Sequence, residues 1–165
     1  MFTFAGFGWA KPVPINPLNF NHYRRGLTLT AIAGVVMNLI MAFLLFPIYK
    51  LVVLYVNIPL WPIQTFVEML FMLLWTYSIS FCVFNLIPLA PLDGWRGVEA
   101  LNRRHGRVYR FFERYGSIIL LILIAIHFVS GYFTVLGYID ILGYILDFAV
   151  NIVAWPITAF WGLIF

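Results

Sequence analysis

One acidic side chain at the end of a long apolar stretch is the strongest candidate for chemistry in this 165-residue sequence. Asp93 follows the uncharged residues 69–92, and Gly94 comes directly after it. A carboxylate at such a position is costly unless it is paired, hydrated or bound to a metal ion. Pro88 and Pro91 break a helix just before it and free backbone carbonyl groups. The segment therefore predicts a polar turn that ends a buried helix.

The same residues allow a structural interpretation without catalysis. Asp93 can be the N-cap of a basic helix over residues 94–114 at the membrane surface, because its carboxylate can accept hydrogen bonds from free N–H groups of the first turn. A capping box would place Glu or Gln where Arg96 stands, so that motif is incomplete. From the residues alone, Asp93 can be either a helix cap or a metal ligand.

The composition indicates the class of protein. Hydrophobic residues make up 64% of the chain, aromatic residues 19% and charged residues 10%. Ten Lys and Arg with six Asp and Glu cannot cover the surface of a water-soluble domain, whereas lipid accepts an apolar surface. The one cysteine, Cys82, excludes a disulfide framework. We therefore expect an integral, multi-pass membrane protein of the all-α class.

The membrane segments follow from the lengths of the uncharged runs. A helix of about 20 apolar residues crosses the hydrocarbon core of about 30 Å. The sequence predicts three membrane helices, at residues 26–49, 63–92 and 117–136. The last segment, 141–165, contains Asp147 and Pro156, and it either crosses the membrane or lies partly in its interface. Residues 1–165 are expected to form a single membrane domain.

The N-terminal segment 1–25 has a different character. Pro12, Pro14 and Pro17 favour extended backbone and forbid a helix interior. Irregular backbone at membrane depth needs protein or water around it. We therefore expect three to four transmembrane helices and, before them, an extended or β segment that lies near the site, on the cytoplasmic side or as a re-entrant segment.

The positive charges gather on one predicted side of the membrane. Lys11, Arg24 and Arg25 precede the first span, and six arginines occupy the loop 94–116 after the second. Cytoplasmic loops carry an excess of Lys and Arg, so both basic segments, and Asp93 with them, are predicted to be cytoplasmic. Membrane lipid is the expected counter-charge. No nucleic acid is expected as a partner, because the basic residues are confined to segments beside the membrane.

Several motifs occur in a fixed order along the chain. Residues 7–17 read FGWAKPVPINP, residues 24–26 read RRG, residues 33–38 read AGVVMN, and residues 85–94 read NLIPLAPLDG. The last is similar to the NxxPxxxLDG signature of the site-2 protease family, the intramembrane zinc metalloproteases. The others resemble, in family order, its FGWAKPVPVNP stretch, the basic turn that follows and its AGPxxN helix motif. The resemblance covers about residues 7–119, with Val35 standing where the family usually has Pro.

The resemblance implies roles for individual residues. In that family the Asp of LDG is the third zinc ligand, which implies this role for Asp93. Independently of the resemblance, Gly94 has no Cβ atom and is expected to let the chain turn beside Asp93. Asn38 is implied as a polar contact near the substrate carbonyl, although a hydrogen bond between helices explains it equally well. Asn85 either ties the broken helix end or assists the site. The implied substrate is a membrane-spanning helix of another protein, unwound and bound edge to edge by residues 2–15.

The zinc site implied by the resemblance is incomplete in this sequence. A hydrolytic zinc ion takes three protein ligands and a water, and the family supplies two His and a Glu from an HExxH helix. No HExxH occurs here, so no catalytic residue is expected and the chain alone should be inactive. Three explanations stay open: the missing helix belongs to the rest of a longer chain, it comes from another polypeptide, or the protein is a noncatalytic pseudoprotease that binds a partner helix.

The three histidines are not spaced as a metal-binding pair. His127 lies within the third predicted span, where a neutral imidazole hydrogen-bonded to a neighbouring helix is commoner than a metal ligand. His22 and His105 belong to the basic segments and are expected at the surface. A small transporter is disfavoured as a function, because four spans without an internal repeat leave little that could alternate between two states.

Overall fold

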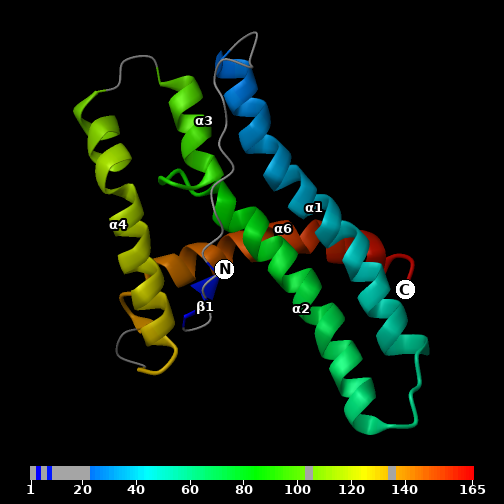
Figure 1. Ribbon diagram of the computed structural model, residues 1–165. Coiled ribbons are helices and arrows are strands. Elements are labelled where there is room, and N and C mark those ends of the chain that lie inside the picture. Colours follow the sequence, from blue (N-terminus) through cyan, green and yellow to red (C-terminus); the bar gives the residue numbers. More distant parts are fainter. Residues whose placement is uncertain (1–2, 5–6, 9–22, 103–105, 134–136) are drawn as a thin grey trace.

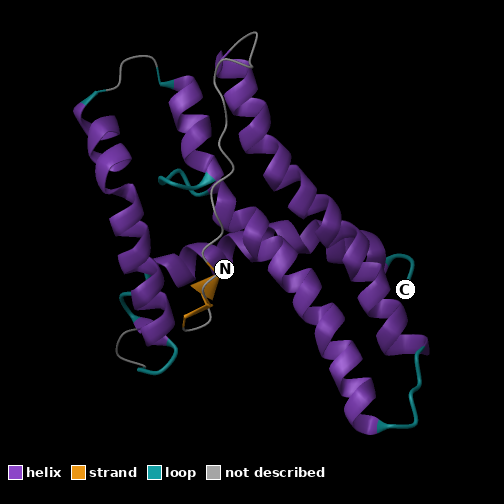
Figure 2. Ribbon diagram, in the orientation of Figure 1, coloured by secondary structure: helices purple, strands orange, loops and turns teal. Residues whose placement is uncertain are grey.

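The computed structural model describes residues 3–4, 7–8, 23–102, 106–133 and 137–165. In this part of the chain the architecture is helical, apart from one short strand pair (Figures 1 and 2). The elements are β1 (Thr3–Phe4), β2 (Phe7–Gly8), α1 (Tyr23–Tyr55), α2 (Trp61–Leu86), α3 (Asp93–Leu101), α4 (Arg107–Ser130) and α6 (Ile141–Gly162). The predicted all-α, multi-pass membrane class is confirmed.

Among the described residues, four helices are long and apolar enough to cross a membrane. They are Thr28–Tyr55 within α1, and the whole of α2, α4 and α6. The 22 residues of α6 correspond to about 33 Å, which is enough for the hydrocarbon core. Pro156 lies inside α6 without ending it. The last segment, which the sequence left undecided, is therefore a helix of membrane-crossing length.

The helix ends differ from the limits drawn on the sequence. α1 continues through Pro47 to Tyr55, and α4 begins at Arg107, well before the expected residue 117. Charged residues marked the predicted limits, whereas helical hydrogen bonding continues past them because long charged side chains can still reach water. α2 ends at Leu86, before residue 92, because the proline at position 88 forces Ile87 into extended backbone (φ −60°, ψ 126°).

The N-terminal strands form a short antiparallel pair. Thr3 lies opposite Gly8, and Phe4 lies opposite Phe7. Extended structure was expected here, and these four residues have it. The proline-rich residues 9–22 lie outside the described part of the chain.

The core joins three helices. α1 packs along α2, and α6 runs across both of them (Figure 1). The buried cluster that they share consists of Ala42, Phe46, Ile79, Val83 and Ile157. In addition, Trp161 Nε1 of α6 donates a hydrogen bond to the backbone oxygen of Phe43 in α1 at 3.0 Å. These contacts fix α1 and α2 relative to each other, and α3 packs against both.

Candidate functional site

The Asp93 carboxylate lies where α3 meets α1. Asp93 is the first residue of α3, and its side chain is 26% exposed. A Cβ atom on Gly34 of α1 would stand only 3.0 Å from Asp93 Oδ2. Any larger residue at position 34 would therefore press on the carboxylate. The structure thus brings together the AGVVMN and LDG motifs, which are far apart in the sequence.

The second carboxylate oxygen has a partner on its own helix. Asp93 Oδ1 lies 3.1 Å from Nη1 of Arg96, one turn further along α3. The first turn of a helix also favours a negative charge, because its free N–H groups point toward it. The carboxylate is therefore charge-compensated within α3.

The interpretation of Asp93 as a helix cap is wrong. Leu92 is the N-cap residue of α3, with extended backbone (φ −70°, ψ 161°), and no side chain caps the helix. Asp93 already belongs to the first turn. The basic helix expected over residues 94–114 is also divided, since α3 ends at Leu101 and α4 begins at Arg107.

Gly94 permits a close approach between two helices. A Cβ atom at this position would lie 2.5 Å from the carbonyl oxygens of both Leu86 and Ile87. These groups belong to the end of α2, where Pro88 interrupts the helix. The backbone of Gly94 is helical, so the residue does not form the expected turn. Its lack of a side chain instead lets the first turn of α3 touch the end of α2.

The loop between α2 and α3 packs against α4. Leu89 and Ala90 are buried, and the Ala90–Pro91 peptide bond is cis. The Leu92 N–H donates a hydrogen bond to the Leu89 carbonyl at 2.9 Å. A Cβ atom on Gly116 of α4 would stand 2.9 Å from the Ala90 carbonyl oxygen, so α4 touches this loop directly. The position of Asp93 therefore depends on α1, α2 and α4 together.

The two asparagines predicted to support the site, Asn38 and Asn85, lie on α1 and at the end of α2. Asn38 follows Gly34 by one helical turn, so both are on the same face of α1. Asn85 is the next-to-last residue of α2. Both side chains are half-buried. Within the described part of the chain neither amide forms a hydrogen bond, and their predicted roles stay predictions.

The described residues do not fit a zinc centre by themselves. A hydrolytic zinc ion needs three protein ligands. In the described ranges, no group of three or more His, Cys, Asp or Glu side chains is placed to hold a metal ion. Asp93 could supply one ligand, and its Oδ1 is paired with Arg96. His22 and His105 lie outside the described residues.

A second polar cluster joins the end of α4 to the start of α6. Asp140 is the N-cap of α6, and its Oδ1 accepts a hydrogen bond from the Gly143 N–H at 2.8 Å. Its Oδ2 accepts a hydrogen bond from Ser130 Oγ at 2.9 Å and lies 2.7 Å from His127 Nδ1. The expectation that His127 bonds to a neighbouring element is confirmed, with the N-cap residue of α6 as its partner.

These contacts shift the pKa of the Asp140 carboxylate. Burial raises its pKa, but the hydrogen bonds from Gly143, His127 and Ser130, together with the charge of His127, lower it by more, so the pKa lies below the ordinary value. Asp140 was not among the residues predicted from the sequence to form a site. An Asp directly before an apolar run is an N-cap signal that could have identified it.

The fold and the site define a multi-pass membrane protein with a carboxylate held between two helices. The chain is 38% identical over 120 residues to the "Putative zinc metalloprotease YwhC" of Bacillus subtilis (strain 168). The alignment covers 72% of this chain and 55% of the relative, so the chain spans about half of the relative's length. No protein-family model and no solved structure matches the chain. The similarity supports a metalloprotease family.

Proposed function

We propose that this chain is the core of a site-2-type zinc metalloprotease, which cleaves membrane-spanning segments of other proteins. The observation that carries the proposal is the contact between Asp93 and Gly34, because it joins two motifs that resemble that family. The Bacillus subtilis relative supports the coarser assignment through its name. Asp93 and the basic segments are proposed to face the cytoplasm, since positive charges concentrate on that side of membranes.

The site is proposed to hold an unwound substrate segment. A membrane helix satisfies its own peptide groups by internal hydrogen bonds, so a substrate must unwind before a peptide bond becomes accessible. The half-buried amides of Asn38 and Asn85 are groups that could bond to such a backbone. The strand pair β1–β2 could add an extended segment along its edge.

Hydrolysis is proposed to need residues beyond this sequence. No HExxH occurs in the chain, and the described residues provide no group for a metal ion. A helix that carries the missing histidines and glutamate would come from the rest of a longer chain or from a second polypeptide. The chain alone is therefore proposed to bind its substrate without cleaving it.

Binding of a fluorescent membrane-spanning peptide to the full chain in nanodiscs tests this proposal. We expect saturable binding, no cleavage, and weaker binding when Asn38→Leu and Asn85→Leu are combined. Asn151→Leu is the matched control, because it removes an amide from α6 that bonds to the Asp147 carbonyl of its own helix. An absence of saturable binding, or an equal loss in the control, would contradict the proposal.

The alternative is a noncatalytic pseudoprotease that holds a partner helix. The ion pair between Asp93 and Arg96 favours it, because a carboxylate with a resident counter-charge needs no metal ion. Sequencing the coding DNA upstream of Met1 separates the two proposals. An in-frame segment with HExxH supports the protease, and a promoter and start site directly before Met1 support the pseudoprotease.

A further inference from the structure

One charged side chain lies on an exposed face of a helix that is long enough to cross the membrane. Asp147 is the seventh residue of α6, and its side chain is exposed. At 1.5 Å per residue it lies about 10 Å along the helix from Asp140, the N-cap residue. When α6 crosses the membrane, Asp147 is therefore inside the hydrocarbon core, where a carboxylate needs a partner.

The Asp147 carboxylate has no partner of its own. Within the described part of the chain it forms no hydrogen bond and no ion pair. Residues 115–165 contain no Lys or Arg. His127 lines the same cavity of about 210 Å³ as Asp147, but its Nδ1 is paired with Asp140. The negative charge of Asp147 is therefore left for a cation from another molecule.

Large side chains surround Asp147 on what we call the outer face of α6. Tyr144, Phe148 and Trp155 are 61%, 70% and 73% exposed. With Asn151 they follow the spacing i, i+4, i+7, i+11, which places them on one side of a helix beside Asp147. The Asn151 side chain donates a hydrogen bond to the Asp147 carbonyl, so its amide is already bonded within α6. The carboxylate is thus the unsatisfied group of this face.

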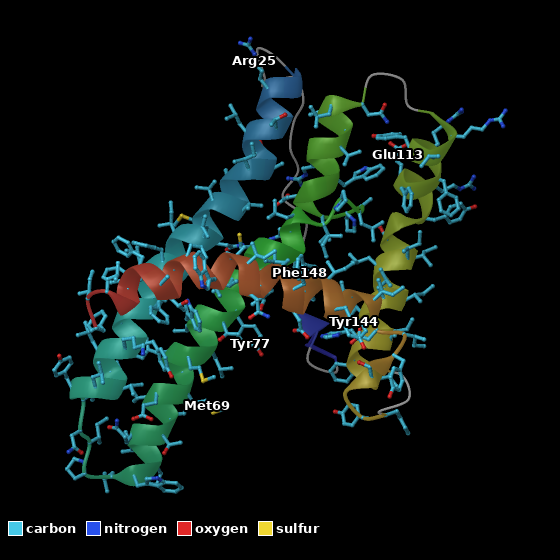
Figure 3. The ribbon with its side chains drawn as sticks, turned by 180° about the vertical axis from the view of Figure 1, so that it is seen from behind. Arg25, Met69, Tyr77, Glu113, Tyr144 and Phe148 are labelled. Atoms are coloured by element: carbon cyan, nitrogen blue, oxygen red, sulfur yellow. The ribbon has the colours of Figure 1, made fainter. Side chains whose placement is uncertain are left out.

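The outer face points away from the rest of the molecule. The opposite side of α6 carries Leu146, Val150, Val153 and Ile157, which pack in the core with α1 and α2. Figure 3 shows α6 in front of these two helices, with Tyr144 and Phe148 along it. The outer face is therefore open to a neighbouring molecule in the membrane.

The charge decides which molecule fits this face. Lipid chains would cover the aromatic rings but would leave the carboxylate uncompensated. A second copy packed α6 against α6 would bring a second Asp147, and like charges repel. In the described ranges no group of three or more His, Cys, Asp or Glu is placed to hold a metal ion. A basic side chain of another membrane helix compensates the charge, because its long aliphatic stem also packs on apolar surface.

We propose that the outer face of α6 binds a membrane-spanning helix of another protein that carries a Lys or Arg at the depth of Asp147. The basic group pairs with the carboxylate, and the rest of the partner helix packs on Tyr144, Phe148 and Trp155. This surface is separate from the proposed protease site, because Asn38 and Asn85 lie on the helices that contact the opposite side of α6.

A pair of synthetic peptides tests the surface on the full chain in phosphatidylcholine nanodiscs. The probe is a fluorescent Leu/Ala helix of about 20 residues with one Lys at its seventh position, and the control peptide has Leu there. Energy transfer from the labelled chain measures binding. We expect the Lys peptide to bind at least about tenfold more tightly, because the ion pair adds hydrogen bonds between charged groups.

Variants of the chain identify the surface. Asp147→Asn should remove the preference for the Lys peptide, and Asp147→Lys should instead prefer a peptide with Asp at the seventh position. Phe148→Ala should weaken binding of the Lys peptide, whereas Phe128→Ala, which removes a ring of 62% exposure from α4, should not.

Three results would overturn the proposal. They are equal binding of the Lys and Leu peptides by the wild type, an unchanged Lys preference in Asp147→Asn, and self-association of the chain that Phe148→Ala abolishes. The peptide pair decides the question on the wild type even if a variant does not fold.

Discussion

Replacement of Gly94 by alanine tests how closely α3 approaches the end of α2. The new Cβ atom would lie 2.5 Å from the carbonyl oxygens of Leu86 and Ile87 and 2.8 Å from the Ile87 carbonyl carbon. All three are backbone atoms, so one helix must move. Overpacking costs up to about 3 kcal/mol, and alanine recovers about 1 kcal/mol of helix propensity over glycine. We expect the free energy of unfolding to fall by about 2 kcal/mol.

Gly97 provides the matched control in the same helix. A Cβ atom at Gly97 would meet no atom within 4 Å, so Gly97→Ala should raise the free energy of unfolding by about 0.5–1 kcal/mol. Unfolding in mixed micelles with increasing dodecyl sulfate, followed by circular dichroism, measures both variants. If Gly94→Ala were as stable as Gly97→Ala, the close approach of α3 to α2, and with it the position of Asp93, would be refuted.

Three further predictions concern the carboxylates. Gly34→Ala places a Cβ atom 3.0 Å from Asp93 Oδ2, so this close contact should offset the gain of about 0.5–1 kcal/mol in helix propensity, and Gly34→Ala should stabilise the protein more when Asp93→Ala is also present; a double-mutant cycle with no coupling would exclude this contact. The Asp93–Arg96 ion pair is partly exposed, so a double-mutant cycle with Asp93→Asn and Arg96→Gln should give a coupling energy of at most about 1 kcal/mol. This coupling energy should shrink at high salt. A much larger coupling energy would mean that the pair is shielded from water. The lowered pKa of Asp140 means that its contribution to stability is complete above about pH 4, the pKa of an unfolded Asp, and is lost as the pH falls through the folded value. Unfolding measured between neutral and acid pH should show this loss in the wild type and not in Asp140→Asn.

The class of the protein could be predicted from the sequence because composition alone determines it. Apolar segments of about 20 residues that contain few charged residues are expected to cross lipid as helices. The importance of Asp93 was also predictable, since a carboxylate at the end of such a run needs a partner. Its neighbour Gly34 was connected to it only through the resemblance of two separate motifs to one family.

Other features depend on packing between distant segments. Gly94 was expected to form a turn, but its role follows from the approach of α3 to Leu86 and Ile87, which no local pattern encodes. Asp140 gains its partners from two different helices, so its hydrogen bonds to His127 and Ser130 were not visible as a motif. The contact of Gly116 with Ala90 is likewise tertiary.

Whether this chain holds a complete catalytic site is tested by measuring peptide-bond cleavage by the purified full chain in nanodiscs with added zinc. A membrane-spanning peptide serves as substrate, and mass spectrometry detects the products. Because the sequence has no HExxH, we predict no cleavage above the level of the Asp93→Asn variant. Cleavage by the wild type that Asp93→Asn abolishes would contradict it, since the chain would then hold a complete catalytic site.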